Sequence, residues 1–433
     1  MDQAIDMELL TEHSWASRQD LIARYYSSVK RRLLLIEQGL GRYELDATLN
    51  DAQKLCEAVC QWILREFKPD MGVFPRLNSH DRDLNKSILQ ALELPALTPR
   101  VIDVLAGQSL KQVLLGGLAM SQLHVFEGIS GTGKTSLAKA FAKAMGGFCT
   151  DIAVQAGWRD RDDLLGHYNA FEKRFYEKDC LQALYKAQTD AWSDRCNVIL
   201  LDEMNLSRPE QYFAEFLSAL EKNSLNERLI SLSENGLADA PKLLKEQRKI
   251  LVPENIWFIG TANHDETTSE LADKTYDRAH VMVLPRQEET FEIRQLAPIK
   301  YSFRSLQERF AKAVSVNQGN VGELLEQLKC SDLTCVLEES FGLGWGNRFE
   351  RQAKRFIPVM IACGASQQDA LDHMLSTRVM RSGKVTGRYD ISVDQLGQIE
   401  DALDTLWKDI GGSEATKSKK MIAEDRRRKE RGA

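Results

Sequence analysis

The 433-residue sequence lacks the features that would indicate a membrane or secreted protein. It contains no apolar run long enough to span a bilayer, and its acidic N-terminus does not suit a secretory signal. None of its eight cysteines forms a C-x-x-C pair, so no zinc set is indicated. These absences predict a soluble, cytoplasmic protein with reduced thiols and no membrane partner.

The chain also lacks an excess of positive charge. It carries 57 Lys and Arg residues against 63 Asp and Glu residues, for a net charge of -6. The whole chain therefore gives no electrostatic sign of nucleic-acid binding, although a local basic patch would not show in this sum. Its hydrophobic content of 43% is ordinary for globular proteins, and its length allows two or three domains.

One stretch dominates the sequence, because residues 128–135 (GISGTGKT) fit the phosphate-binding pattern G-x-x-x-x-G-K-[ST]. Residues 123–127 are typical of a buried strand, and residues 136–145 are typical of a helix. Glycines let backbone N–H groups turn towards a phosphate, and the helix N-terminus adds partial positive charge. Lys134 is expected to reach the β- and γ-phosphates and Thr135 to bind Mg²⁺. The predicted nucleotide-binding residues are Gly128, Ser130, Gly131, Thr132, Gly133, Lys134, Thr135 and Ser136.

A second motif, NVILLDE (residues 197–203), is typical of a buried strand ending in two acids, and its Asp202 lies 68 residues after Lys134. Asp202 is predicted to hold Mg²⁺, and Glu203 to orient and deprotonate the attacking water. Further along, residues 226–253 indicate a β-hairpin with a long polar tip, which is either a plain surface insertion or a substrate contact. Residues 255–262 are typical of another core strand, followed by Asn263.

The pattern divides the chain into four parts. Residues 1–95 are predicted to form a helical domain, and residues 96–290 an α/β nucleotide-binding domain with a parallel sheet flanked by helices. Residues 291–410 are predicted to be a helical domain, with an irregular segment at 331–346. The polar, basic tail at 411–433 is predicted to be disordered because it has no apolar periodicity.

The ordered set of motifs resembles the AAA+ ATPases, over residues 115–390. The segments 200–221 (LLDEMNLSRPEQYFAEFLSALE) and 256–279 (IWFIGTANHDETTSELADKTYDRA) are similar to the branch that holds MoxR-type ATPases and the McrB GTPase. The hairpin at 226–253 corresponds to the insertion before sensor 1 in that branch. The resemblance implies a P-loop core with a C-terminal helical lid.

The resemblance also implies roles for single residues. Asn263 takes the sensor-1 position, and Arg278 takes the position of the arginine finger, which would complete the site of a neighbouring subunit. Arg348 takes the sensor-2 position at the start of a lid helix, with Arg351 one turn further on as the alternative. The string around Asn263 departs from McrB, which favours ATP over GTP.

At the level of function, the resemblance implies an ATPase that works with Mg²⁺ as a homo-oligomeric ring, expected to be a hexamer. One hypothesis is a McrB-like motor of a restriction or anti-phage system, acting on DNA with a separate effector or nuclease subunit. The alternatives are a MoxR-like chaperone that remodels a protein partner, and a nucleotide-gated scaffold that assembles without doing work.

Overall fold

The computed structural model describes residues 108–172, 174–237, 240–263, 271–284, 302–381 and 392–430. The predicted N-terminal helical domain at 1–95 lies outside these ranges. The described chain divides into two compact units. One contains Asp162–Arg195 and Lys222–Asn255, and the other contains Cys196–Glu221 together with the described residues before 162 and after 255.

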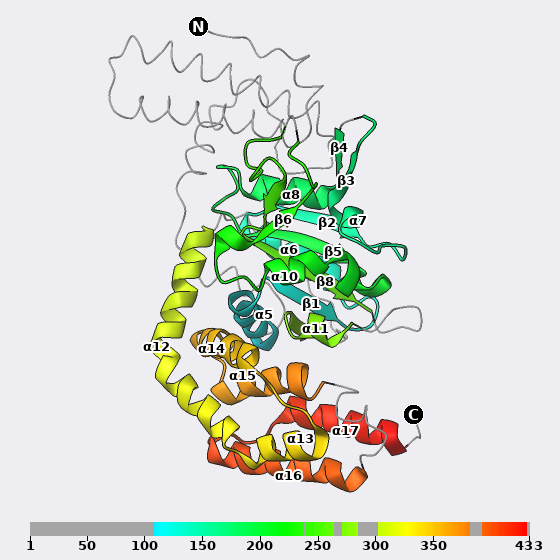
Figure 1. Cartoon of the computed structure of the whole chain (residues 1–433). Coiled ribbons are helices and arrows are strands. Elements are labelled where there is room, and N and C mark those ends of the chain that lie inside the picture. The colour runs from blue at the N-terminus through cyan, green and yellow to red at the C-terminus, as the bar shows by residue number, and fades with distance from the viewer. Residues whose placement is uncertain are drawn as a thin grey trace, which may run out of the picture. The chain divides into compact units, whose positions relative to one another are not determined.

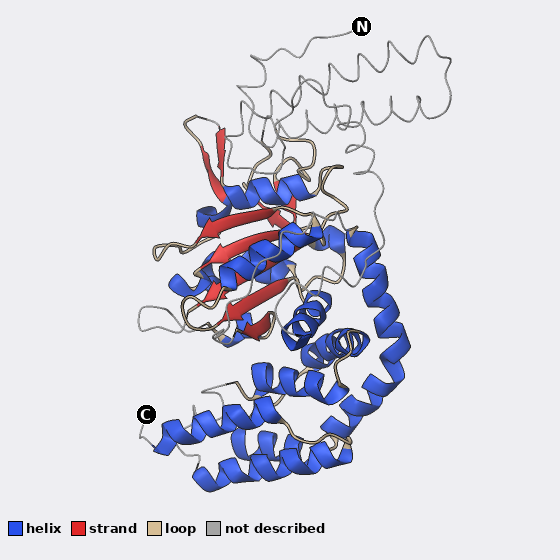
Figure 2. Cartoon of the chain, turned by 180° about the vertical axis from the view of Figure 1, so that it is seen from behind, coloured by secondary structure: helices blue, strands red, loops and turns tan. Residues whose placement is uncertain are grey.

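The larger unit is built on a five-stranded sheet in which every pairing is parallel. Its strands run in the order β2 (Cys149–Ala153), β5 (Asn197–Asp202), β8 (Ile256–Ala262), β1 (Leu123–Glu127) and β9 (His280–Val283) (Figures 1 and 2). All residues of β1 and β8 are buried, as is expected for central parallel strands covered on both faces. The predicted α/β P-loop core is confirmed.

Helices cover both faces of this sheet. Neighbouring residues of a strand point to opposite sides, so successive residues of β8 contact helices on different faces. On β8, the Trp257 ring packs edge-on against Phe141 of α6 (Lys134–Met145). The next residue, Phe258, packs against Phe213 and Phe216, which lie around α10 (Ala214–Ala219). The sheet edge at β9 contacts α5 (Gln108–Met120). Short elements complete the layer on the α10 side: η2 (Met204–Leu206), α9 (Pro209–Tyr212) and α11 (Asp273–Tyr276).

The described part of the smaller unit contains two antiparallel hairpins and one longer helix, α8 (Asp179–Ala187). The hairpin of β6 (Leu229–Ser231) and β7 (Lys249–Leu251) falls within the predicted 226–253 segment. The other hairpin, β3 (Gly166–Asn169) with β4 (Arg174–Glu177), has no counterpart among the predicted elements. It follows α7 (Asp162–Leu165), and η3 (Leu225–Glu227) precedes β6. Four-residue strands carry too little alternation to be recognised by pattern.

The C-terminal part of the larger unit is helical, as predicted. Its elements are α12 (Phe303–Lys329), α13 (Asp332–Phe341), α14 (Asn347–Ala362), α15 (Gln367–Met374), the π-helix η4 (Leu375–Val379), α16 (Val393–Asp409) and α17 (Thr416–Glu430). The expectation of an irregular segment at 331–346 is wrong for α13. Leu333, Leu337 and Phe341 of this helix are buried, so one apolar face was present in the sequence.

The prediction of a disordered tail is also wrong for residues 416–430, which form α17. The Asp372 side chain of α15 accepts hydrogen bonds from the backbone N–H groups of Lys417 (2.8 Å) and Ser418 (2.9 Å). It also accepts one from the Ser418 hydroxyl at 2.6 Å. A buried carboxylate therefore caps the first turn of α17 and complements its dipole. Ile422 of α17 is fully buried, so the helix packs as well as being capped.

The described residues can be searched for membrane-spanning helices, disulfides and metal-binding groups. No described helix has both the length and the apolar character that a membrane crossing requires. The six cysteines in the described ranges are all free thiols: Cys149, Cys180, Cys196, Cys330, Cys335 and Cys363. Within those ranges no three His, Cys, Asp or Glu side chains lie together in a group that could hold a metal ion.

Candidate active site

The glycine-rich loop connects β1 to α6, and its backbone conformation requires glycine. Gly128, Gly131 and Gly133 have φ angles of 146°, 81° and 84°, which side-chain-bearing residues rarely adopt. A Cβ atom on Gly128 would also lie 2.7 Å from the Leu284 carbonyl oxygen. Helix α6 begins at Lys134 without a side-chain cap from Gly133. The first amides of a 12-residue helix are therefore left for an external anion.

Lys134 lies folded over this loop. Its Nζ atom donates hydrogen bonds of 2.8 Å to the carbonyl oxygens of Gly128 and Ile129, and the residue is only 6% exposed. Burial lowers the pKa of Lys134, and the nearby negative charge of Asp202 opposes that shift. The ammonium group is thus held by two neutral carbonyl groups of the loop, and a bound phosphate would give it a charged acceptor in their place.

The Asp202 carboxylate at the end of β5 collects two hydroxyl groups. Thr135 Oγ1 donates to Asp202 Oδ1 at 2.7 Å, and Thr261 Oγ1 donates to the same oxygen at 2.8 Å. The register between β5 and β8 pairs Leu201 with Gly260, which places Asp202 beside Thr261. Hydroxyl and carboxylate oxygens are the ligands that Mg²⁺ prefers, so Thr135 and Asp202 fit the predicted metal site.

Glu203 follows directly and has an unusual backbone. Its φ and ψ angles are 54° and 46°, in the left-handed region, which costs a residue with a side chain on the order of 1–3 kcal/mol and is found mainly at functional sites. Its backbone N–H donates a 2.9 Å hydrogen bond to Thr261 Oγ1. The buried Met204 comes next and anchors the turn. The Glu203 side chain itself is exposed, at the edge of the sheet where β5 ends.

Asn263 lies at the same edge of the sheet. It follows the last residue of β8, the neighbour of β5, and Asn205 Nδ2 donates a 2.8 Å hydrogen bond to its carbonyl oxygen. Asp202 ends β5, Glu203 follows it, Asn263 follows β8, and Lys134 follows the loop after β1. The carboxyl ends of parallel strands share one edge, so all four residues lie beyond that edge. The structure therefore brings these predicted residues to one region of the fold.

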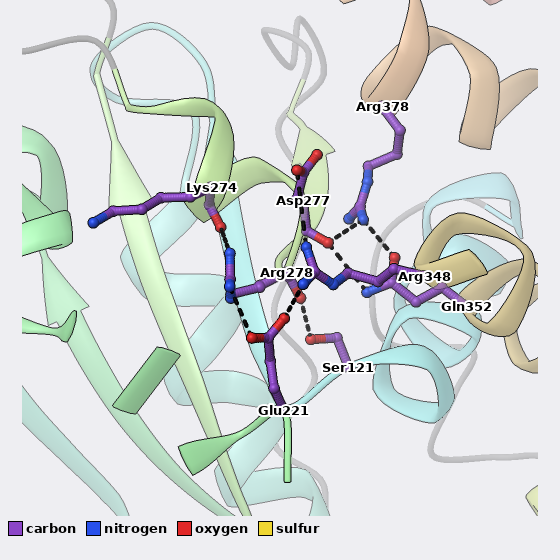
Figure 3. Close-up of polar contacts among 8 residues, drawn as sticks. All are labelled: Ser121, Glu221, Lys274, Asp277, Arg278, Arg348, Gln352 and Arg378. Atoms are coloured by element: carbon purple, nitrogen blue, oxygen red, sulfur yellow. Dashed lines mark hydrogen bonds and ion pairs between the residues drawn. The ribbon is translucent and has the colours of Figure 1, made fainter. Parts of the chain in front are cut away.

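The two predicted arginines form a second group, around Glu221 (Figure 3). Arg278 Nη2 donates to Glu221 Oε2 at 2.8 Å, and Arg278 Nη1 donates to the Lys274 carbonyl oxygen at 2.8 Å. Arg348, at the start of α14, forms an ion pair with Glu221 and lies 3.9 Å from Asp277 Oδ2. Arg348 is thus placed beside Arg278. Arg351, the alternative, lies one turn further on and is exposed.

Two polar residues of these groups were not among the sequence candidates. Thr261 could have been found by aligning the ends of β5 and β8, since it pairs laterally with Asp202. Glu221 carries no local signal, because it is one acidic residue after an amphipathic helix. Only the folded chain shows that it lies between two arginines.

Comparison with known proteins identifies a family whose model matches the part of the chain that carries these residues. The model of the AAA domain, dynein-related subfamily, matches residues 124–279, from β1 to the residue before β9. Among curated proteins, no relative matches the chain. A crystal structure of a candidate ATPase from Cytophaga hutchinsonii ATCC 33406 is similar at 16% identity and a TM-score of 0.45, covering 75% of this chain and 98% of that one.

The family match covers the P-loop, the Asp202–Glu203 strand, Asn263 and Arg278. The sheet order, in which β1 lies between β8 and β9, and the loop geometry at Lys134 agree with a nucleotide-binding site of this family. Residues 124–279 therefore form an AAA domain of the kind found in AAA+ ATPases.

Proposed function

We propose that this chain hydrolyses ATP with Mg²⁺ at the site formed by the P-loop and the ends of β5 and β8. The observation that carries the proposal is the convergence of the Thr135 and Thr261 hydroxyls on one oxygen of Asp202, at 2.7 and 2.8 Å. Hydroxyl, carboxylate and buried ammonium groups on one loop and two strand ends match the needs of a metal-bound triphosphate.

Each residue then has a defined task. The loop amides and Lys134 bind the β- and γ-phosphates, while Thr135 and Asp202 hold the metal ion. Mg²⁺, when bound, neutralises charge that develops on the phosphate oxygens. Glu203 accepts the proton of the attacking water, and Asn263 orients that water or the γ-phosphate. ATP is the preferred nucleotide because the segment around Asn263 departs from that of the GTP-using McrB.

We further propose that the active form is a ring, expected to be a hexamer, in which Arg278 of one subunit completes the site of the next. Support comes from the exposure of the pair, since the Arg278 and Arg348 side chains are 21% and 34% exposed. Both could therefore meet an anion presented from outside the chain. An arginine supplied in this way is worth roughly 10³- to 10⁵-fold in rate in other phosphoryl-transfer enzymes.

The biological role that we propose is that of the motor subunit in a McrB-like restriction or anti-phage system, acting on DNA with a separate effector or nuclease. This part rests on the resemblance of segments 200–221 and 256–279. The alternative roles are a MoxR-like chaperone and a nucleotide-gated scaffold. The measurements below separate the three.

The test measures ATP turnover of the purified chain against protein concentration, with and without duplex DNA, alongside GTP. We expect turnover per subunit to rise as rings assemble, to rise again with DNA, and to fall in Arg278→Ala. Stimulation by a protein partner alone would favour the chaperone. Full biological function of Glu203→Gln would favour the scaffold. Normal turnover of an assembled Arg278→Ala ring would contradict the between-subunit site.

A further inference from the structure

Glu221 lies directly beyond α10, and each of its carboxylate oxygens faces a different arginine (Figure 3). Oε2 accepts the 2.8 Å hydrogen bond from Arg278 Nη2, and Oε1 pairs with Arg348 Nη2. The Glu221 side chain is 30% exposed, so water screens these pairs only in part. One acid therefore links two cations that come from distant segments.

Besides Glu221, each arginine has contacts of its own within residues 274–278 and with Ser121. Arg278 is anchored through its Nη1 group on the Lys274 carbonyl and through its own carbonyl oxygen, which accepts a 2.7 Å hydrogen bond from Ser121 Oγ. Arg348 has a weaker additional contact, with Asp277 Oδ2 at 3.9 Å. Glu221 is the group that both guanidinium groups share, and its single negative charge leaves a net positive charge on the trio.

We propose that Glu221 is a positioning residue that holds Arg278 and Arg348 side by side, so that both meet the triphosphate bound by a second copy of this chain. The inference rests on the proposed between-subunit site. Long arginine side chains lose considerable rotamer freedom when they bind an anion. A carboxylate that fixes them beforehand removes part of that loss, and misplacement by about 1 Å can reduce a rate by about 10²-fold.

The chain offers a matched control on α10, six residues before Glu221. Glu215 of α10 forms an ion pair with Arg161 at 2.9 Å, and the two side chains are 43% and 30% exposed. The chemistry and degree of exposure resemble those of the Glu221 pairs, but the partner of Glu215 is Arg161 rather than Arg278 or Arg348. Glu215→Gln therefore removes a comparable ion pair of the fold without disturbing the two arginines.

The test mixes two inactive chains. Arg278→Ala keeps its own nucleotide site but cannot complete that of a neighbour, and Lys134→Ala lacks its own site but can complete another. We expect the mixture to regain ATP turnover. Glu221→Gln is then added to the Lys134→Ala chain in one mixture and to the Arg278→Ala chain in another. Glu215→Gln is placed in the same two chains in parallel, and each variant's melting temperature is measured.

The inference requires an asymmetric result. Glu221→Gln in the Lys134→Ala chain should lower the regained kcat by about 10- to 100-fold with little change in KM for ATP. In the Arg278→Ala chain it should leave kcat within about twofold, as should Glu215→Gln in either chain. An equal loss from both chains would mean that Glu221 only stabilises the fold, and unchanged or higher turnover would also overturn the inference. If the first mixture regains no activity, the between-subunit site itself is wrong.

Discussion

Thr261 Oγ1 donates a 2.8 Å hydrogen bond to Asp202 Oδ1 and so ties the end of β8 to the acid that ends β5. The same hydroxyl oxygen accepts a 2.9 Å hydrogen bond from the backbone N–H of Glu203. Thr261 therefore orients both the predicted metal ligand and the residue predicted to activate water, although it is not expected to touch nucleotide itself.

From this relationship we expect Thr261→Val to raise the Mg²⁺ concentration that ATP turnover requires. The change keeps the shape but removes both hydrogen bonds, and loss of such an outer contact typically costs 10- to 100-fold in metal affinity or activity. Titrating ATP turnover with Mg²⁺ should show a higher requirement, which Thr261→Ser should largely restore. An Mg²⁺ curve identical to that of the wild type would separate Thr261 from the metal site.

Glu203→Gln should retain nucleotide binding and lose hydrolysis. Removing a general base commonly lowers kcat by 10²- to 10⁴-fold, whereas the amide leaves the left-handed turn unchanged. The measurements are the Kd of a fluorescent ATP analogue and steady-state turnover. Lys134→Ala provides the contrast, because it should weaken binding as well. Equal Kd values for wild type and Lys134→Ala would contradict the assignment of the loop.

Three buried histidines form a chain that joins the sheet to α15. His280 of β9 lies with Nδ1 3.2 Å from His124 Nδ1 of β1, and with Nε2 3.3 Å from His373 Nε2 of α15. Burial lowers the pKa of His124 to about 4 and that of His373 to about 3, and it lowers the pKa of His280 strongly as well. The cationic Arg378 and Lys417 face the chain and add to the shifts at His280 and His373.

This chain predicts acid-sensitive stability. The three rings have lower pKa values when folded than the ordinary 6.5, so below that pH the unfolded state binds more protons. The free energy of unfolding should therefore fall as pH drops from about 6.5 to about 4, by up to about 1.4 kcal/mol per pH unit for each histidine. Denaturant unfolding of wild type and His373→Gln should show a shallower pH dependence in the variant. Parallel curves would mean that His373 does not contribute.

Gly260 of β8 lies against Met204, and we expect Gly260→Ala to destabilise the site. A Cβ atom there would lie 2.2 Å from Met204 Sδ, which must shift within a closely packed interior. Overpacking of this kind typically costs 1–3 kcal/mol, and the shift would also displace Glu203. Gly319→Ala in the exposed middle of α12 is the control, since nothing lies within 4 Å of its added methyl group. The control should instead gain roughly 0.5–1 kcal/mol in chemical denaturation.

Asp372→Asn should loosen α17. An amide can accept only part of the three hydrogen bonds from Lys417 and Ser418, and it removes the charge that favours the helix N-terminus. Leaving buried donors unsatisfied costs about 1–3 kcal/mol. Limited trypsin digestion should cut the variant first among the basic residues of α17. A cleavage pattern like that of the wild type would show that burial of Ile422 is sufficient to hold the helix.

The nucleotide-binding part of the site could be predicted from the sequence because its determinants are contiguous. Gly128, Lys134 and Thr135 belong to one turn, and Asp202 and Glu203 end one strongly apolar strand. The parallel order then brings the strand ends together without further information. The positive φ angles of the loop glycines fit the phosphate-binding motif, and the left-handed backbone of Glu203 fits a functional position at the end of β5.

Other features depend on partners far away in the chain. Glu221 and Arg278 are separated by 57 positions, and exposed Glu and Arg residues are too common for such a pair to be recognised by composition. The α17 helix was predicted to be disordered for a related reason. Its own residues carry little apolar periodicity, and the group that starts the helix, Asp372, belongs to α15.

Asp372 and His373 are consecutive, and they point to different neighbours. Asp372 grips the first turn of α17, while His373 reaches His280 and, through it, His124 on the strand that enters the P-loop. A displacement of α15 would therefore act on the first turn of α17 and on the histidine chain at the same time.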